Sequence, residues 1–127
     1  MFKFSTISVI SASVSFVLFV LLLVFPQLIY ILFSVEGNAS AYFFTRRAAL
    51  LFLGLAIIAF LSRNAPHSTS RQAICLGIGM TMLSLCLLGA IEYFRGYAGI
   101  GIFAAMAGEL FIAIGYLYTY VTHRNYA

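Results

Sequence analysis

The stretch ISVISASVSFVLFVLLLVFPQLIYILF, residues 7–33, runs for 27 residues without a charged side chain. A helix needs about 20 mostly apolar residues to cross the hydrocarbon core of a bilayer, so this stretch predicts a membrane-spanning helix. It is too long to stand straight, because it would rise about 40 Å against a core of about 30 Å. Pro26 lacks a backbone donor and predicts a kink. We expect the helix to be retained, since no A-x-A-like cleavage site follows it.

The rest of the chain has the same apolar character. Of the 127 residues, 64% are hydrophobic and 8% are charged, and the mean hydropathy is +1.09; a soluble domain is about a quarter charged. Three further apolar runs, at about 42–61, 72–93 and 98–121, are joined by short connections. The sequence therefore predicts an all-α polytopic membrane protein. Its single transmembrane domain, residues 1–127, would be a four-transmembrane-helix bundle.

The cationic residues indicate an orientation rather than a nucleic-acid partner. The net charge is +4, but the cations are scattered, whereas a nucleic-acid interface needs a clustered patch. Lys and Arg near helix ends favour the cytoplasmic side. We expect both termini in the cytoplasm and the protein in the inner cell membrane, because the side with the termini has the larger number of cations: Lys3, Arg63, Arg71 and Arg124 against Arg46, Arg47 and Arg95.

Two adjacent arginines begin the second apolar run. Only 15 uncharged residues separate Arg47 from Arg63, so the helix must begin before Arg46 and place both arginines at or just below the headgroups. Glu36 and Glu92 are expected on the same face of the membrane. We expect an ion-pair cluster of these four residues. The alternative is that the arginines extend to lipid phosphate.

The fourth helix combines a glycine seam with an acid. Gly101, Gly108 and Gly115 recur every seven residues and share a face, which favours close helix packing in lipid. Glu109 adjoins this seam near the predicted middle of the span. An ionised carboxylate facing lipid there is costly, so it should be neutral, paired or hydrated. Arg47 is the candidate partner. Glu109 is either a coupling carboxylate for protons or cations or a polar contact that fixes helix packing.

Small residues also form stripes on two other helices. The third helix has Cys75, Gly79, Met82, Cys86 and Gly89 on one stripe, and the first has Ser8, Ser11, Ala12 and Ser15. Both stripes predict close packing, within this chain or against another. For the serines, packing is favoured over a conducting pore, because their hydroxyls can bond to carbonyls of the preceding turn.

The chain contains few of the groups that enzymes use. Lys3 is the only lysine, both histidines are expected at membrane edges, and no metal-ligand spacing or catalytic triad can be assembled. We therefore expect no enzymatic activity, no catalytic residues, no cofactor and no metal.

The middle of the chain resembles a known group of proteins. RRAALLFLGLAIIAFLSRNAP, residues 46–66, is followed by RQAICLGIGMTMLSLCLLGAIEYFRG, residues 71–96. This pattern of arginine-led apolar helices, about half the chain, resembles small bacterial four-helix inner-membrane proteins, largely uncharacterised and partly grouped as DoxX-like. The resemblance implies a bacterial cytoplasmic membrane and a four-helix bundle, and it brings no catalytic residues. Small multidrug transporters have a similar length, but they place an essential Glu in the first helix, where this chain has no acid.

These observations lead to two main expectations for function. The first is a non-enzymatic assembly or accessory subunit, or a scaffold, in a membrane complex. The alternative is a small oligomeric transporter or proton or ion conduit, with Glu109 as the coupling carboxylate and Arg47 as the charge that tunes it. A third option is a subunit of a membrane redox or lipid enzyme whose cofactor another chain holds. The expected partners are the lipid bilayer and other membrane chains or further copies of this one, with no nucleic acid.

Overall fold

The computed structural model describes residues 4–123, which form five α-helices and, within that range, no strand. The helices are α1 (Phe4–Val24), α2 (Pro26–Phe33), α3 (Ala39–Leu61), α4 (Thr69–Phe94) and α5 (Ile102–His123). All except α2 are long and apolar enough to cross a membrane. The fold is therefore the predicted bundle of four transmembrane helices, and the chain is a multi-pass membrane protein.

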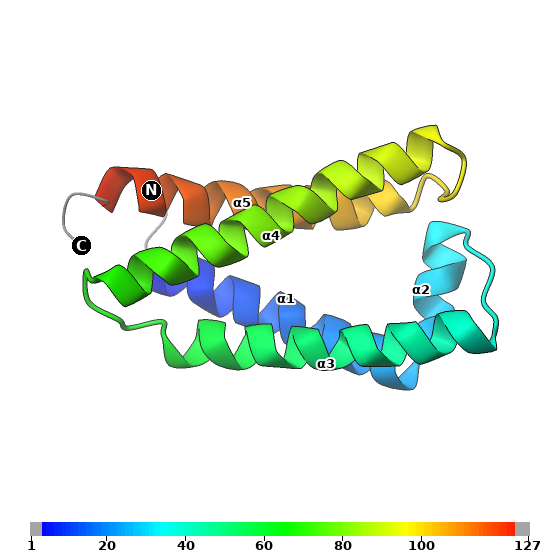
Figure 1. The fold of residues 1–127 in the computed structure, drawn as a ribbon, viewed down its shortest axis with the longest axis horizontal. Helices are drawn as coiled ribbons and strands as arrows, with labels where there is room; N and C mark the ends of the chain where they lie inside the picture. The colour runs from blue at the N-terminus through cyan, green and yellow to red at the C-terminus, as the bar shows by residue number, and fades with distance from the viewer. Residues whose placement is uncertain (1–3, 124–127) are drawn as a thin grey trace.

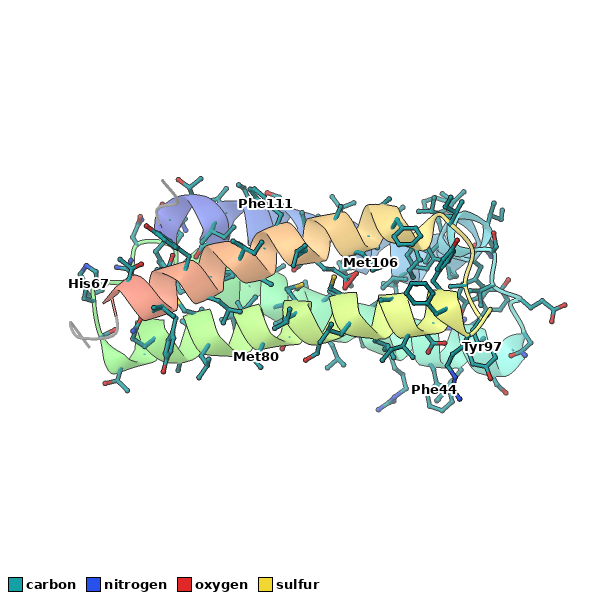
Figure 2. All side chains as sticks on the ribbon, turned by 90° about the horizontal axis from the view of Figure 1, so that it is seen from above. Phe44, His67, Met80, Tyr97, Met106 and Phe111 are labelled. Atoms are coloured by element: carbon teal, nitrogen blue, oxygen red, sulfur yellow. The ribbon has the colours of Figure 1, made fainter. Side chains whose placement is uncertain are left out.

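The four long helices form two antiparallel pairs, α1 with α3 and α4 with α5 (Figure 1). A contact between α1 and α5 joins the pairs. We call the end where α3 is followed by α4 the α3–α4 end; α1 begins and α5 ends there as well. The opposite end, where α4 turns into α5, is the α4–α5 end. Figure 2 shows His67 at the α3–α4 end and Tyr97 and Phe44 at the α4–α5 end.

The first apolar run is broken into two helices, whereas the sequence predicted one kinked helix over 7–33. α1 ends at Val24, and Pro26 begins α2. Proline at the first position of a helix has no donor to lose, but it cannot continue a helix that reaches it. Phe25 between them is non-helical, with φ −128° and ψ 55°. As a result α1 alone crosses the membrane, and α2 turns sharply away from its axis (Figure 1).

Contacts on both sides hold α2 across the α4–α5 end. The Tyr30 hydroxyl is hydrogen-bonded to the Thr45 hydroxyl of α3, and the Tyr30 ring stacks on Tyr42 at 5.1 Å between centroids. On the other side, the Gly99 N–H donates to the Phe33 carbonyl at 2.6 Å. α2 therefore bridges α3 and the connection between α4 and α5.

Side-chain caps explain why α3 and α4 begin earlier than predicted. The Asn38 side chain accepts a hydrogen bond from Ala41 N at 2.8 Å, and the Ser68 hydroxyl accepts one from Arg71 N at 3.2 Å. These are helix N-cap contacts, which satisfy backbone donors of the first turn. α3 therefore begins at 39 rather than 42, and α4 begins at 69 rather than 72.

α5 begins later than predicted, at 102 rather than 98. Gly96 ends α4 in the left-handed region, with φ 80°, and the Tyr97 N–H donates back to the Glu92 carbonyl at 2.9 Å. This is a glycine stop of the kind that commonly ends helices. Residues 98–101 then form turns against α2 instead of a helical turn.

The tightly packed core lies toward the α3–α4 end. It is formed by Phe4, Ile7, Ala12, Ala59, Cys75, Ile78, Met82, Ile112, Ala113 and Tyr116. Glycines allow the close approach: a Cβ at Gly79 would lie 2.9 Å from Leu117, and one at Gly115 would lie 2.5 Å from Ile7. The other end of the bundle is packed less completely, and the candidate site lies there.

Candidate functional site

An apolar cavity of about 350 Å³ lies between the two helix pairs, from the edge of the core toward the α4–α5 end. This volume falls within the roughly 300–1,000 Å³ of small-molecule sites. Two wall residues are charged, and both are acids: Glu92 of α4 and Glu109 of α5. The remaining wall is Val14, Leu18, Leu22, Ile29, Phe33, Phe52, Met82, Leu85, Leu88, Gly89, Ile102, Ala104, Ala105, Gly108 and Ile112.

The two acids lie at different depths in the cavity wall. α4 and α5 are antiparallel, with the Tyr93 ring 4.7 Å from the Phe103 ring. Continuing this register places Glu92 about 8 Å nearer the α4–α5 end than Glu109. The sequence placed Glu109 near the middle of its span; it lies about 10 Å from the start of α5, because α5 begins later than expected. Glu92 is therefore the outer acid of the cavity and Glu109 the inner one.

Glu109 has no partner from α3. Its half-buried carboxylate makes no hydrogen bond or ion pair with any residue in 4–123. Arg47, its candidate partner, is exposed, and its guanidinium lies 5.8 Å from the centre of the Phe43 ring on its own helix. The structure does not bring the two together, because α3 packs chiefly on α1, and α1 stands between α3 and α5.

The expected cluster of Arg46, Arg47, Glu36 and Glu92 does not form either. Both arginines are exposed in the second and third turns of α3, whereas Glu36 is exposed in the connection before that helix. Glu92 faces the cavity. The arginines lie about 10–12 Å along α3, too far from the loop for Glu36 to meet them. Contact with lipid phosphate, the alternative, stays a prediction.

The glycine seam of α5 makes close helix contacts at its two ends but faces open space in the middle. A Cβ at Gly115 would collide with Ile7 of α1, and a Cβ at Gly101 would collide with the Leu32 carbonyl of α2. At Gly108 a Cβ would meet no atom within 4 Å, and this residue lines the cavity. The absence of a side chain at Gly108 therefore leaves open space beside Glu109.

α4, which is the third predicted span, packs against α5 through its own small residues. A Cβ at Gly89 would lie 2.9 Å from Met106, whose side chain fills the space between the two helices (Figure 2). Cys86 is a free, half-buried thiol on the same helix, and Cys75 is a free, buried one. The stripe therefore packs within the α4–α5 pair.

A buried polar cluster at the α3–α4 end was not anticipated from the sequence. Arg71 is 9% exposed and Gln72 is 8% exposed. The Arg71 guanidinium lies 4.4 Å from the centre of the Phe4 ring, and Gln72 Nε2 donates to the Tyr120 carbonyl at 3.1 Å. From the sequence, Arg71 counted only as one of the cations near helix ends that indicate orientation. The signal for burial was the apolar run that begins immediately after Gln72, which places both residues in the first turn of a packed helix.

A comparison of this chain with protein-family models, curated proteins and solved structures finds no match in any of the three. The resemblance to DoxX-like proteins therefore stays a prediction. Among the residues that the structure describes, no group of three or more His, Cys, Asp or Glu is arranged to hold a metal ion. The candidate site is thus defined by its own geometry: an apolar cavity with two acids at different depths.

Proposed function

We propose that this protein is a small membrane conduit or proton-coupled carrier in which Glu109 binds the transported proton. The observation that supports this proposal is the Glu109 carboxylate, which lines an apolar cavity and has no partner in the described chain. An ionisable residue inside a membrane bundle is costly to retain, and such residues commonly mark ion or proton pathways. A carboxylate among apolar walls can take up and release a proton without a change in packing.

Glu92 supports the same function from the outer part of the cavity. It lies two residues before the end of α4, close to the level of the headgroups. In this position it can exchange protons with water at the α4–α5 end and with Glu109 through the cavity. A negative outer site also raises the local concentration of protons and other cations.

The test is proton flux into vesicles that contain the purified chain and a trapped pH-sensitive dye, with valinomycin and K⁺ to balance charge. Glu109→Gln keeps the size of the side chain and removes its proton-binding charge, so the flux should fall to the level of protein-free vesicles. Glu36→Gln is the matched control, because Glu36 is exposed in the connection between α2 and α3. Wild-type flux in a well-folded Glu109→Gln variant would contradict the proposal.

The assembly role remains a second candidate, for a different reason than the sequence indicated. The glycines Gly79, Gly89, Gly101 and Gly115 pack inside the chain, so they do not require a partner. A second row of small residues does face outward from α4, beside a shallow surface hollow: Ala73, Gly77, Thr81 and Ser84. Small residues on a lipid-facing surface favour contact with another helix.

Purification in mild detergent separates the two candidates. A subunit or scaffold should bring partner chains in fixed stoichiometry, whereas a chain that purifies alone and conducts protons would contradict the assembly role. For localisation we propose the inner membrane with the α3–α4 end in the cytoplasm. Labelling of Asn64→Cys in whole cells by a membrane-impermeant thiol reagent, with Glu36→Cys unlabelled, would contradict that orientation.

A further inference from the structure

Four buried side-chain atoms in residues 4–123 have no hydrogen-bond partner: Ser11 Oγ, Ser15 Oγ, Arg71 Nε and Gln72 Oε1. Buried polar atoms are normally satisfied, and internal water commonly supplies the missing bond. None of these four atoms lies at the α4–α5 end; all lie between the cavity and the α3–α4 end. Their shared location requires an explanation beyond the close packing expected of a serine stripe.

The serines form a row along the contact between α1 and α5. The helices are antiparallel there, because Gly115 meets Ile7 and the Tyr116 hydroxyl donates to Ser8 Oγ at 3.2 Å. Continuing this register brings Ser11 opposite Ile112 and Ser15 opposite Gly108. Successive serine positions are about 4.5–6 Å apart along the helix axis, a gap that one water molecule can bridge.

The Ser15 end of this row lies close to the cavity. Ser15 lies between two cavity-lining positions of α1, Val14 and Leu18, and it is at the level of Gly108, where a side chain would meet no atom within 4 Å. Glu109 is the next residue of α5 and lines the same cavity. Ser15 therefore lies at the depth of the Glu109 carboxylate.

The lower end of the row reaches the start of α4. The Tyr116 hydroxyl faces both Ser8 and Ser11, and its ring contacts Phe4 at 6.1 Å between centroids. The Arg71 guanidinium lies over the Phe4 ring, and Oε1 of the neighbouring Gln72 has no partner. Arg71 also donates to the Ala65 carbonyl at 3.3 Å, in the connection between α3 and α4. Polar groups therefore lie from the membrane edge to the depth of Glu109, with the Phe4 ring between Arg71 and Tyr116.

We propose that Gln72, Tyr116, Ser8, Ser11 and Ser15 form, with internal water, a proton path from the α3–α4 end to Glu109. Each hydroxyl or water oxygen in such a row accepts a proton on one side as it releases one to its neighbour, so each step forms one O–H bond and breaks another. The Gln72 amide oxygen has no proton to release, and its role is to hold the first water by accepting a hydrogen bond. Glu109 takes up the proton at the end of the row and passes it toward Glu92. This inference rests on the proposed function, because it assigns the route by which Glu109 is loaded from the side opposite Glu92.

The test compares proton flux through vesicles containing Ser11→Ala with Ser15→Ala, singly and together. Proton flux through the double variant should be about tenfold lower than through wild type, since each lost hydroxyl removes a hydrogen bond from the path. Its thermal unfolding in detergent should change little, because Ser15 Oγ has no partner and Tyr116 keeps its hydrogen bond to Ser8 when the Ser11 hydroxyl is removed. Ser13→Ala is the matched control: Ser13 lies on the same helix but faces outward. Ser15→Thr keeps the hydroxyl and should keep the flux.

The outcomes separate this inference from the proposed function. If Glu109→Gln abolishes flux while the double serine variant conducts like wild type, the serine path is wrong and the role of Glu109 stands. If neither variant loses flux, both proposals are wrong. If the double variant does not insert, the comparison of Ser15→Ala with Ser15→Thr decides, and equal flux in these two variants would contradict the path.

Discussion

Glu109 carries a large local cost. An acidic side chain inside a transmembrane helix costs up to about 3 kcal/mol, the value at the helix centre on insertion scales, which is a large share of a typical folding stability of about 5–15 kcal/mol. If Glu109 only fixed helix packing, a hydrogen bond or an ion pair would offset that cost. In the described chain Glu109 has neither, and it lines an open cavity instead. This balance favours a working carboxylate over a packing contact.

Asn38 provides a test of local structure at the residue scale. Its side chain caps α3 through the 2.8 Å bond from Ala41 N. Asn38→Ala should lower the free energy of unfolding by about 1 kcal/mol, because a backbone donor of the first turn loses its partner. Thermal unfolding in detergent measures this change, with Ser40→Ala as the control inside the same turn. Equal stability of the two variants would show that Asn38 does not cap the helix.

At the scale of helices, glycines determine where two elements can approach each other closely. Gly101 faces the Leu32 carbonyl of α2 so closely that a Cβ could not be placed without a backbone shift, whereas Gly54 of α3 has no atom within 4 Å of that position. Gly101→Ala should therefore destabilise the protein by about 1–3 kcal/mol through overpacking.

Gly54→Ala is the control for that prediction. It adds the same methyl group in open space and replaces a poor helix former by a good one, so it should be neutral or stabilising by up to about 1 kcal/mol. Chemical unfolding of both variants in the same detergent measures the difference. A Gly101→Ala variant as stable as Gly54→Ala would mean that α2 does not pack on the α4–α5 connection as described.

The helices themselves could be predicted from the sequence because hydrophobic length is a local property. The apolar runs placed all four spans, and Pro26 marked the position where the first run changes direction. What the sequence could not show was whether Pro26 kinks one helix or begins another, since this depends on the contacts of α2. The Tyr30–Tyr42 stack and the Gly99–Phe33 hydrogen bond join residues far apart in the chain, and no local pattern encodes them.

The site was only partly predictable for the same reason. The sequence showed Glu109 as an acid next to Gly108, one of the small residues of the glycine seam. The pairing of Glu109 with Arg47 failed because it assumed that α3 lies against α5, whereas α3 packs on α1. The cavity and the buried Arg71 also depend on how the two helix pairs meet. Hydrophobic length identifies which segments span the membrane. In a chain this uniformly hydrophobic, it does not identify which helix faces pack against each other.

At the scale of the whole molecule, two well-packed helix pairs enclose a hollow rather than a continuous core. The helices pack closely at the α3–α4 end, and α2 lies across the α4–α5 end. The cavity with both acids lies between. From Glu92 to Ser8, the two acids and the serine row extend over about 18 Å of the bundle along its axis, more than half of a hydrocarbon core of about 30 Å. The architecture therefore provides polar groups at intervals across an otherwise apolar span.

The most direct test of this account is proton flux through vesicles that contain Gly108→Leu. Gly108 is exposed and lines the cavity, and a Cβ there meets no atom within 4 Å, so the added side chain should cover the cavity beside Glu109 while the fold is kept. Gly54→Leu, with equal space on α3, is the control. We predict that Gly108→Leu loses at least about tenfold of the flux, equivalent to about 1.4 kcal/mol in the barrier, while Gly54→Leu conducts like wild type. Wild-type flux in a folded Gly108→Leu protein would contradict conduction through the cavity.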